Sequence, residues 1–205
     1  PTDGTFAAAQ IGVSINSAVI QNNLINQCGR AIMFNSADFS ISDAVTINNN
    51  IIGSSTALVY PYTAPVTTVY AKGIWVAGTN SLAVSNNTIR AVLSYLNTTL
   101  TGIELSASIG SGTLNVSDNT ITGVSNNNTS AGNAAGILVS SIGGAYTISA
   151  NSISVIESNA NFQNVAAVQI NTTGAAGIIS ENNISKLNPR AAGGAGVNGL
   201  QLQAA

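Results

Sequence analysis

The 205-residue sequence has few of the side chains on which enzymes and nucleic-acid-binding proteins depend. It has no histidine, one cysteine, and only 6% charged residues, with five Lys and Arg against seven Asp and Glu. Five scattered cations cannot form the basic stripe that neutralises phosphates, so we expect no nucleic-acid partner. The lone Cys28 cannot form an internal disulfide, and without histidine no imidazole can activate its thiol. No apolar run of about 18 residues is present, so we expect no membrane-spanning helix.

Apolar residues, in contrast, make up 45% of the chain, which is enough for a continuous core. Because charged residues are far below the usual share of about a quarter, the surface must consist mainly of Asn, Ser, Thr and Gly. Abundant and evenly spread Ile, Val and Leu argue against disorder. The length suits one domain or one elongated unit, and we treat residues 1–205 as a single segment.

A six-residue unit recurs along the chain, for example as VSNNTI at 84–89 and as VSDNTI at 116–121. Successive copies are 27, 37, 32, 32 and 31 residues apart. Fixed periods of about 20–50 residues are typical of solenoids, propellers and other repeat arrays. Asn occupies the fourth place of the unit in all six copies, at Asn23, Asn50, Asn87, Asn119, Asn151 and Asn182.

Each period contains three short strand-like segments separated by turns. One precedes the unit, as GIEL at 102–105; one ends at the Asn; and one follows it, as TITGV at 120–124. No apolar stripe with a 3.6-residue period runs for two turns, and a propeller blade would need four longer antiparallel strands. The pattern therefore predicts an all-β parallel β-helix of about six to seven coils, stacked at the strand spacing of about 4.8 Å.

In such a coil the recurrent Asn stands at one turn and stacks on its equivalents. Asn tolerates the left-handed backbone region, and its amide can bond to the next coil's Asn or to the turn backbone. We therefore predict an internal Asn ladder, with a ligand-binding row as the alternative. Cys28 falls in a predicted apolar column, where an inert buried thiol is expected, and Asn126 falls in a predicted loop.

The strand sequence GIxV followed by VSNNTI and a further Ile resembles right-handed parallel β-helix proteins of the pectate-lyase-like superfamily. More narrowly, it resembles large secreted surface proteins of Bacteroidetes-type bacteria. The resemblance covers nearly the whole chain and implies a right-handed β-helix. It implies little about function, because this fold serves lyases, hydrolases, adhesins and phage spikes alike.

The carboxylates do not form the clusters that polysaccharide-cleaving enzymes generally use. Asp118 and Glu181 fall in one turn column, two coils or about 9.6 Å apart, with Ala150 between them. That separation suits an inverting glycosidase, but we expect variable, exposed turn residues there. Glu104 has no carboxylate beside it. We therefore expect no catalytic residue, no metal site and no cofactor.

The main irregularity of the repeat is an inserted loop at residues 53–72, which lengthens one period to 37 residues. It holds Tyr60, Tyr62 and Tyr70, and Trp75 follows on an outward-facing strand position with Glu104 as its neighbour one coil on. Aromatic faces beside a carboxylate suit sugar stacking, so these five residues are the candidate ligand-binding set. The alternative is a loop that uses its aromatic residues to cover apolar surface.

The terminal coils start and stop without a visible cap, so we expect a fragment of a longer protein or a surface that stacks on flanking domains or on copies of itself. The expected function is a non-catalytic stalk, fibre or adhesin of a secreted or cell-surface bacterial protein, located extracellularly and contacting carbohydrate or another cell-surface ligand. The alternative is a polysaccharide-binding or polysaccharide-cleaving domain with its site near residues 53–75.

Overall fold

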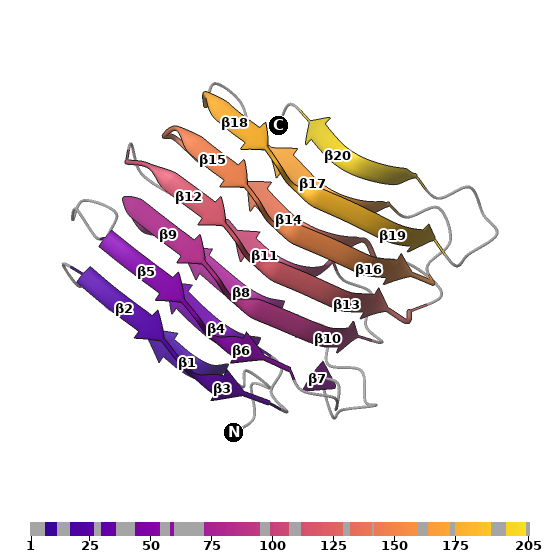
Figure 1. Ribbon diagram of the computed structural model, residues 1–205, viewed down its shortest axis with the longest axis horizontal. Helices are drawn as coiled ribbons and strands as arrows, with labels where there is room; N and C mark the ends of the chain where they lie inside the picture. The colour runs from indigo at the N-terminus through magenta and orange to yellow at the C-terminus, as the bar shows by residue number, and fades with distance from the viewer. Residues whose placement is uncertain are drawn as a thin grey trace.

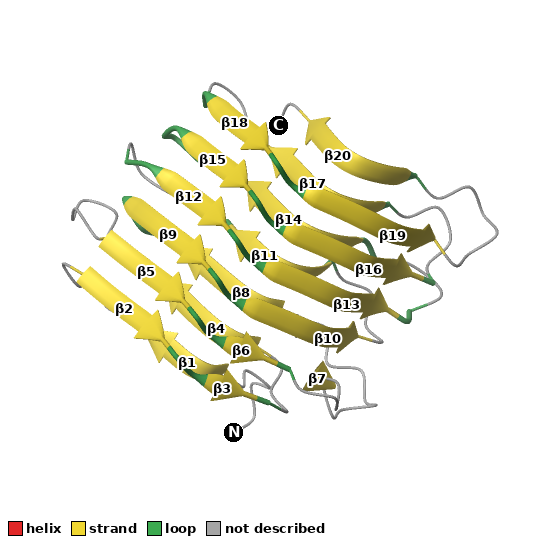
Figure 2. Cartoon of the chain, in the orientation of Figure 1, coloured by secondary structure: helices red, strands yellow, loops and turns green. Residues whose placement is uncertain are grey.

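The computed structural model consists of strands and the turns between them wherever its placement is described (Figure 2). Within this part, no helix is long and apolar enough to cross a membrane. The described residues are 7–11, 17–26, 30–35, 44–53, 58–59, 72–94, 99–106, 112–128, 132–140, 142–159, 164–172, 175–189 and 196–203.

The strands form three parallel sheets, and successive strands of the chain pass from one sheet to the next (Figure 1). Sheet 1 contains, in spatial order, β1 (Ala7–Ile11), β4 (Arg30–Asn35), β8 (Lys72–Ala77), β11 (Leu100–Leu105), β14 (Ala134–Ser140), β17 (Val165–Asn171) and β20 (Val197–Gln203). Sheet 2 contains β2 (Ser17–Gln21), β5 (Ala44–Asn48), β9 (Ser81–Ser85), β12 (Leu114–Ser117), β15 (Tyr146–Ser149) and β18 (Gly177–Ser180). Sheet 3 contains β3 (Leu24–Ile25), β6 (Ile51–Ile52), β10 (Thr88–Ser94), β13 (Thr120–Asn126), β16 (Ser152–Ser158) and β19 (Asn183–Pro189), with β7 (Leu58–Val59) also paired to β10.

The strand register stacks equivalent repeat positions directly on one another, as the sequence predicts. In sheet 1, Ile103 pairs with Ile74 on one side and with Ile137 on the other. These side chains are fully buried in one continuous apolar core. Because side chains of a strand alternate between its two faces, a regular inward Ile or Val in each strand is enough to build that core. The prediction of an all-β parallel solenoid with three strands per coil is confirmed.

The turn between sheets 2 and 3 uses the left-handed backbone region one residue earlier than the sequence argument placed it. The residue before each ladder Asn has φ between 54° and 59°, and these residues are Asn22, Asn49, Asn86, Asp118, Ala150 and Glu181. The assignment of this region to the ladder Asn itself was therefore wrong. The positive φ turns the chain from one sheet to the next, and the following Asn then points inward. Asp118 and Glu181 are exposed, so this position tolerates several side chains.

A second left-handed column bends the strands of sheet 3. It consists of Ala91, Gly123, Val155 and Lys186, with φ between 52° and 73°. These residues fall between paired positions, as where Arg90 pairs with Thr122 and Val92 with Val124. The strand keeps its register on both sides of the bend, so β10, β13, β16 and β19 turn without losing their partners.

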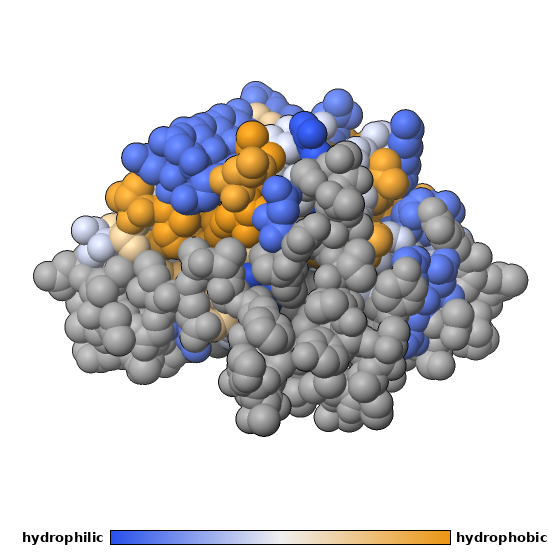
Figure 3. Space-filling view, turned by 90° about the horizontal axis from the view of Figure 1, so that it is seen from below, coloured by the Kyte–Doolittle hydropathy of each residue, from blue (hydrophilic) through white to orange (hydrophobic). Residues whose placement is uncertain are grey.

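The outer faces of the three sheets differ in exposure. The outward side chains of sheet 1 are largely buried, since Met33, Glu104 and Gln169 are 5–8% exposed. Outward positions of sheets 2 and 3 are exposed, as at Asn115 and Thr120, or half-buried, as at Ala83. The surface is not purely polar, because Figure 3 shows hydrophobic atoms beside hydrophilic ones on one face. The exposed large apolar side chains are Val19, Leu24, Ile51, Ile178, Val197, Leu200 and Leu202.

Candidate functional site

The recurrent Asn residues form a hydrogen-bonded ladder along the inside of the turn between sheets 2 and 3. The Oδ1 atom of Asn119 accepts from both the backbone N–H and the Nδ2 of Asn87, each at 3.0 Å. In turn, Asn119 donates from its backbone N–H and its Nδ2 to Oδ1 of Asn151, again at 3.0 Å. Its Nδ2 also donates to the carbonyl of Val84 in the preceding coil at 2.9 Å. One amide side chain therefore satisfies polar groups in two neighbouring coils.

The same bonds link the rungs on either side, from Asn23 to Asn50 at one end and from Asn151 to Asn182 at the other. The four inner rungs, Asn50, Asn87, Asn119 and Asn151, are 0–1% exposed. A buried and fully bonded amide offers nothing to a ligand, so the alternative of a ligand-binding row does not fit the inner rungs. The ladder is structural.

Asn126 is not the inert loop residue that the sequence suggested. It ends β13, is fully buried, and accepts a hydrogen bond from the backbone N–H of Asn128 at 3.0 Å. Its Nδ2 lies 3.4 Å from the carbonyl of Asn133, to which it donates. The strand runs further than the apolar pattern indicated, because buried polar residues continue it at 125–126.

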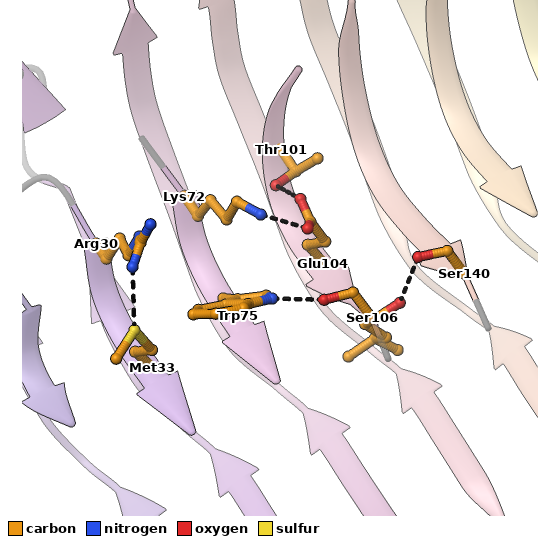
Figure 4. Close-up of polar contacts among 9 residues, drawn as sticks. Arg30, Met33, Lys72, Trp75, Thr101, Glu104, Ser106 and Ser140 are labelled. Atoms are coloured by element: carbon orange, nitrogen blue, oxygen red, sulfur yellow. Dashed lines mark hydrogen bonds and ion pairs between the residues drawn. The ribbon is translucent and has the colours of Figure 1, made fainter. Parts of the chain in front are cut away.

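A cluster of polar and aromatic side chains lies on the outer face of sheet 1, in strands β4, β8 and β11 (Figure 4). Trp75 stands between the core residues Ile74 and Val76, so it points to the opposite face of β8. Glu104 pairs with Trp75 in register, in agreement with the neighbour relation inferred from the repeat. Three residues upstream of these two, Lys72 pairs with Thr101.

An ion pair between Lys72 and Glu104 forms the centre of this cluster. Both side chains are buried, and the second carboxylate oxygen of Glu104 accepts a hydrogen bond from the Thr101 hydroxyl at 3.1 Å. Burial lowers the pKa of the Lys72 ammonium, and the attraction of Glu104 opposes that shift only in part. The carboxylate of Glu104 is thus already committed to a cation and to a hydroxyl.

Trp75 contacts both cations of the cluster and donates a hydrogen bond to the next coil. Its Nε1 donates to the Ser106 hydroxyl at 2.6 Å, while Arg30 Cζ lies 4.9 Å and Lys72 Nζ 5.1 Å from the centre of the indole ring. Both distances are within the range of cation–π attraction. In Figure 4 both cations lie on the same side of the ring. Because the cations occupy that side, a ligand would have to stack on the other face of the half-buried indole.

The remaining members of the predicted ligand-binding set, Tyr60, Tyr62 and Tyr70, lie outside the described residues, as do Cys28 and most of the 53–72 loop. Sequence reasoning missed the pairing of Lys72 with Glu104. The repeat alignment contained the signal for this pairing. Lys72 precedes Trp75 by three residues, and Thr101 precedes Glu104 by three residues, so the alignment that places Trp75 beside Glu104 also places Lys72 beside Thr101 on the same strand as Glu104. Finding it required the register and the burial of this face.

Within the described part of the chain, no group of three or more His, Cys, Asp or Glu residues is placed to hold a metal ion. The arrangement on sheet 1 combines an indole, two cations and one carboxylate that is paired with Lys72. In comparisons with known proteins, no protein-family model, curated protein or solved structure matches this chain.

Proposed function

We propose that this chain is a non-catalytic structural and adhesive segment of a large secreted or cell-surface bacterial protein, of the kind its repeat resembles. The observation that supports this role is the continuous Asn ladder beside a continuous apolar core. Each rung is bonded to the next coil, so bending the solenoid would break bonds in the buried interior. A stiff and neutral rod is suited to building a stalk or fibre.

The positions of the four carboxylates that the structure describes support a role without catalysis. Glu104 is paired with Lys72, and Glu157 is buried with the Ser125 hydroxyl 3.5 Å away, at the limit for a hydrogen bond. Asp118 and Glu181 stand on exposed turns two coils apart. Glycoside hydrolysis by the common mechanisms needs two carboxylates flanking one bond, with one of them kept protonated.

The first test is incubation of the full chain with a panel of acidic and neutral polysaccharides. We expect no new reducing ends and no unsaturated products. Release of either kind of product by the purified chain, above that of a heat-denatured sample, would overturn the non-catalytic role.

A second candidate function is carbohydrate binding at the sheet 1 cluster, which the half-buried Trp75 and its two neighbouring cations favour. With two cations against one carboxylate the cluster carries a net positive charge, which suits an acidic polysaccharide, and the aromatic ring suits the apolar face of a sugar. The ligand-binding set predicted from the sequence also includes Tyr60, Tyr62 and Tyr70, which lie outside the described residues.

The test compares retention of wild type, Trp75→Ala and Arg90→Ala on immobilised acidic polysaccharides. Arg90 is a matched control, because it is an exposed cation on sheet 3, away from the cluster. We expect Trp75→Ala to lose retention by at least about tenfold and Arg90→Ala to keep it. Equal losses in both variants would indicate attraction by overall charge and remove this candidate.

A further inference from the structure

The outer face of sheet 2 contains a hollow that neither the ladder nor the sheet 1 cluster explains. It has a volume of about 260 Å³ and extends over the three consecutive strands β5, β9 and β12. Its lining includes Thr46, Ala83 and Asn115, one residue from each strand.

The hollow results from one small side chain in an outward column. Thr46 pairs with Ala83, and Ala83 pairs with Asn115, so the three stand side by side across neighbouring coils. Alanine ends at Cβ, whereas its two neighbours extend further from the sheet. The backbones that carry these two walls are two strand spacings apart, or about 9.6 Å.

The hollow is lined by small side chains, polar groups and strand backbone. Val45 and Leu82 are 2–3% exposed and their side chains face the core, so they line the hollow with backbone atoms, while Ala83 contributes its methyl group. The hydroxyls of Ser81 and Thr113 and the amide of Asn115 belong to the same lining. Among the described residues that line it, none carries a charge.

We infer that this hollow binds one neutral sugar residue of a glycan. A pyranose ring has an apolar C–H face that can rest on the Ala83 methyl group, and hydroxyls that can exchange hydrogen bonds with the hydroxyl and amide groups of the lining. An anionic ligand would call for cations, and an ammonium ligand for carboxylates, neither of which is found among the described lining residues. The volume accommodates a single ring better than an extended acyl chain.

This inference rests on the adhesive part of the proposed function and gives it a ligand class. It places that ligand on sheet 2 and not on the Trp75 cluster of sheet 1. The two sites are therefore separable by mutation, because a change at one leaves the lining of the other intact.

The experiment measures binding of the full chain to neutral hexasaccharides of glucose, xylose, mannose and galactose by titration calorimetry. Ala83→Phe fills the hollow with an outward side chain. Thr147→Phe adds the same ring in the same outward column, one coil beyond Asn115 and outside the described lining. Asn115→Ala removes the amide of the lining without adding bulk. Thermal unfolding of each variant establishes that it is folded.

We expect wild type to bind at least one of these oligosaccharides, with binding at least about tenfold weaker in Ala83→Phe, weaker in Asn115→Ala, and unchanged in Thr147→Phe and Trp75→Ala. No binding by wild type, unchanged binding by a folded Ala83→Phe, or equal losses in Ala83→Phe and Thr147→Phe would overturn the inference. If Ala83→Phe does not fold, unchanged binding by Asn115→Ala overturns it instead. None of these outcomes bears on cleavage, which the reducing-end assay decides separately.

Discussion

The Asn ladder and the Lys72–Glu104 cluster are two solutions to the same problem, since both place polar groups where water is largely excluded. The ladder is neutral, and every inner rung finds its partners in the coils on either side. The cluster is charged and occurs once among the described residues, with Thr101 and Trp75 completing it. A neutral amide can repeat without limit because each copy supplies what the next one needs. A buried charge needs a local counter-charge, and the exchange of water for one partner is rarely a net gain.

The largest expected effect comes from interrupting the ladder at an inner rung. Asn119→Ala removes the acceptor for two donors of Asn87 and the donor for the Val84 carbonyl. Leaving such buried groups unpaired costs about 1–3 kcal/mol each. We expect the free energy of unfolding, measured by urea denaturation, to fall by about 3 kcal/mol or more. The matched control is Asn115→Ala, an exposed Asn of the same coil, for which little change is expected. Similar losses in both would mean that the ladder is not a main source of stability.

The next effect concerns the cluster, where one partner can be removed or both replaced. Glu104→Ala leaves the Lys72 ammonium buried without its carboxylate, for which we expect a loss of about 3 kcal/mol. The double variant Lys72→Met/Glu104→Leu removes both charges and keeps comparable volume, so its stability should be close to that of wild type. If the double variant is as unstable as Glu104→Ala, the ion pair contributes to stability as much as the ladder does, and the contrast between the two is wrong.

A smaller effect is expected at the outer rung of the ladder. Asn23 is exposed, whereas Asn119 is 1% exposed, and water can replace the bonds that Asn23 makes. Asn23→Ala should therefore cost about 1 kcal/mol. Chemical denaturation of Asn23→Ala and Asn119→Ala side by side measures this gradient. A loss at Asn23 equal to that at Asn119 would show that burial does not set the strength of the ladder.

The smallest expected effect is a pH dependence that arises from Lys72 in the cluster. Burial lowers the pKa of Lys72 below 10.5, so between the folded pKa and 10.5 the unfolded chain binds more protons than the folded one. The contribution of Lys72 to stability therefore rises with pH across this interval. Compared with Lys72→Met, wild type should gain stability from neutral pH toward 10.5, as measured by denaturation at several pH values. Parallel pH profiles for the two proteins would contradict the assigned shift.

Several features of the fold were predictable because they depend on local pattern. The period, the three strands per coil and the identity of the ladder rungs follow from the alternation of apolar residues and from an Asn that never changes at its place. The sequence argument placed the left-handed backbone conformation at the ladder Asn, one position too late. The residue that adopts it varies among Asn, Asp, Ala and Glu, so its identity does not indicate a left-handed conformation. Asn126 was assigned to a loop for a related reason, since a buried polar strand end looks like a loop in sequence.

The sequence by itself determined that the chain folds as stacked coils, because a fixed period with inward Ile and Val leaves few other ways to bury the apolar residues. Only the tertiary structure decided that the outer face of sheet 1 is buried, that Lys72 meets Glu104 there, and that Ala83 opens a hollow on sheet 2. These features depend on which side chains stand beside one another in neighbouring coils and on what covers each face. The repeat indicates which residues some 30 positions apart are neighbours, but it does not specify how their side chains pair or how deeply each face is buried.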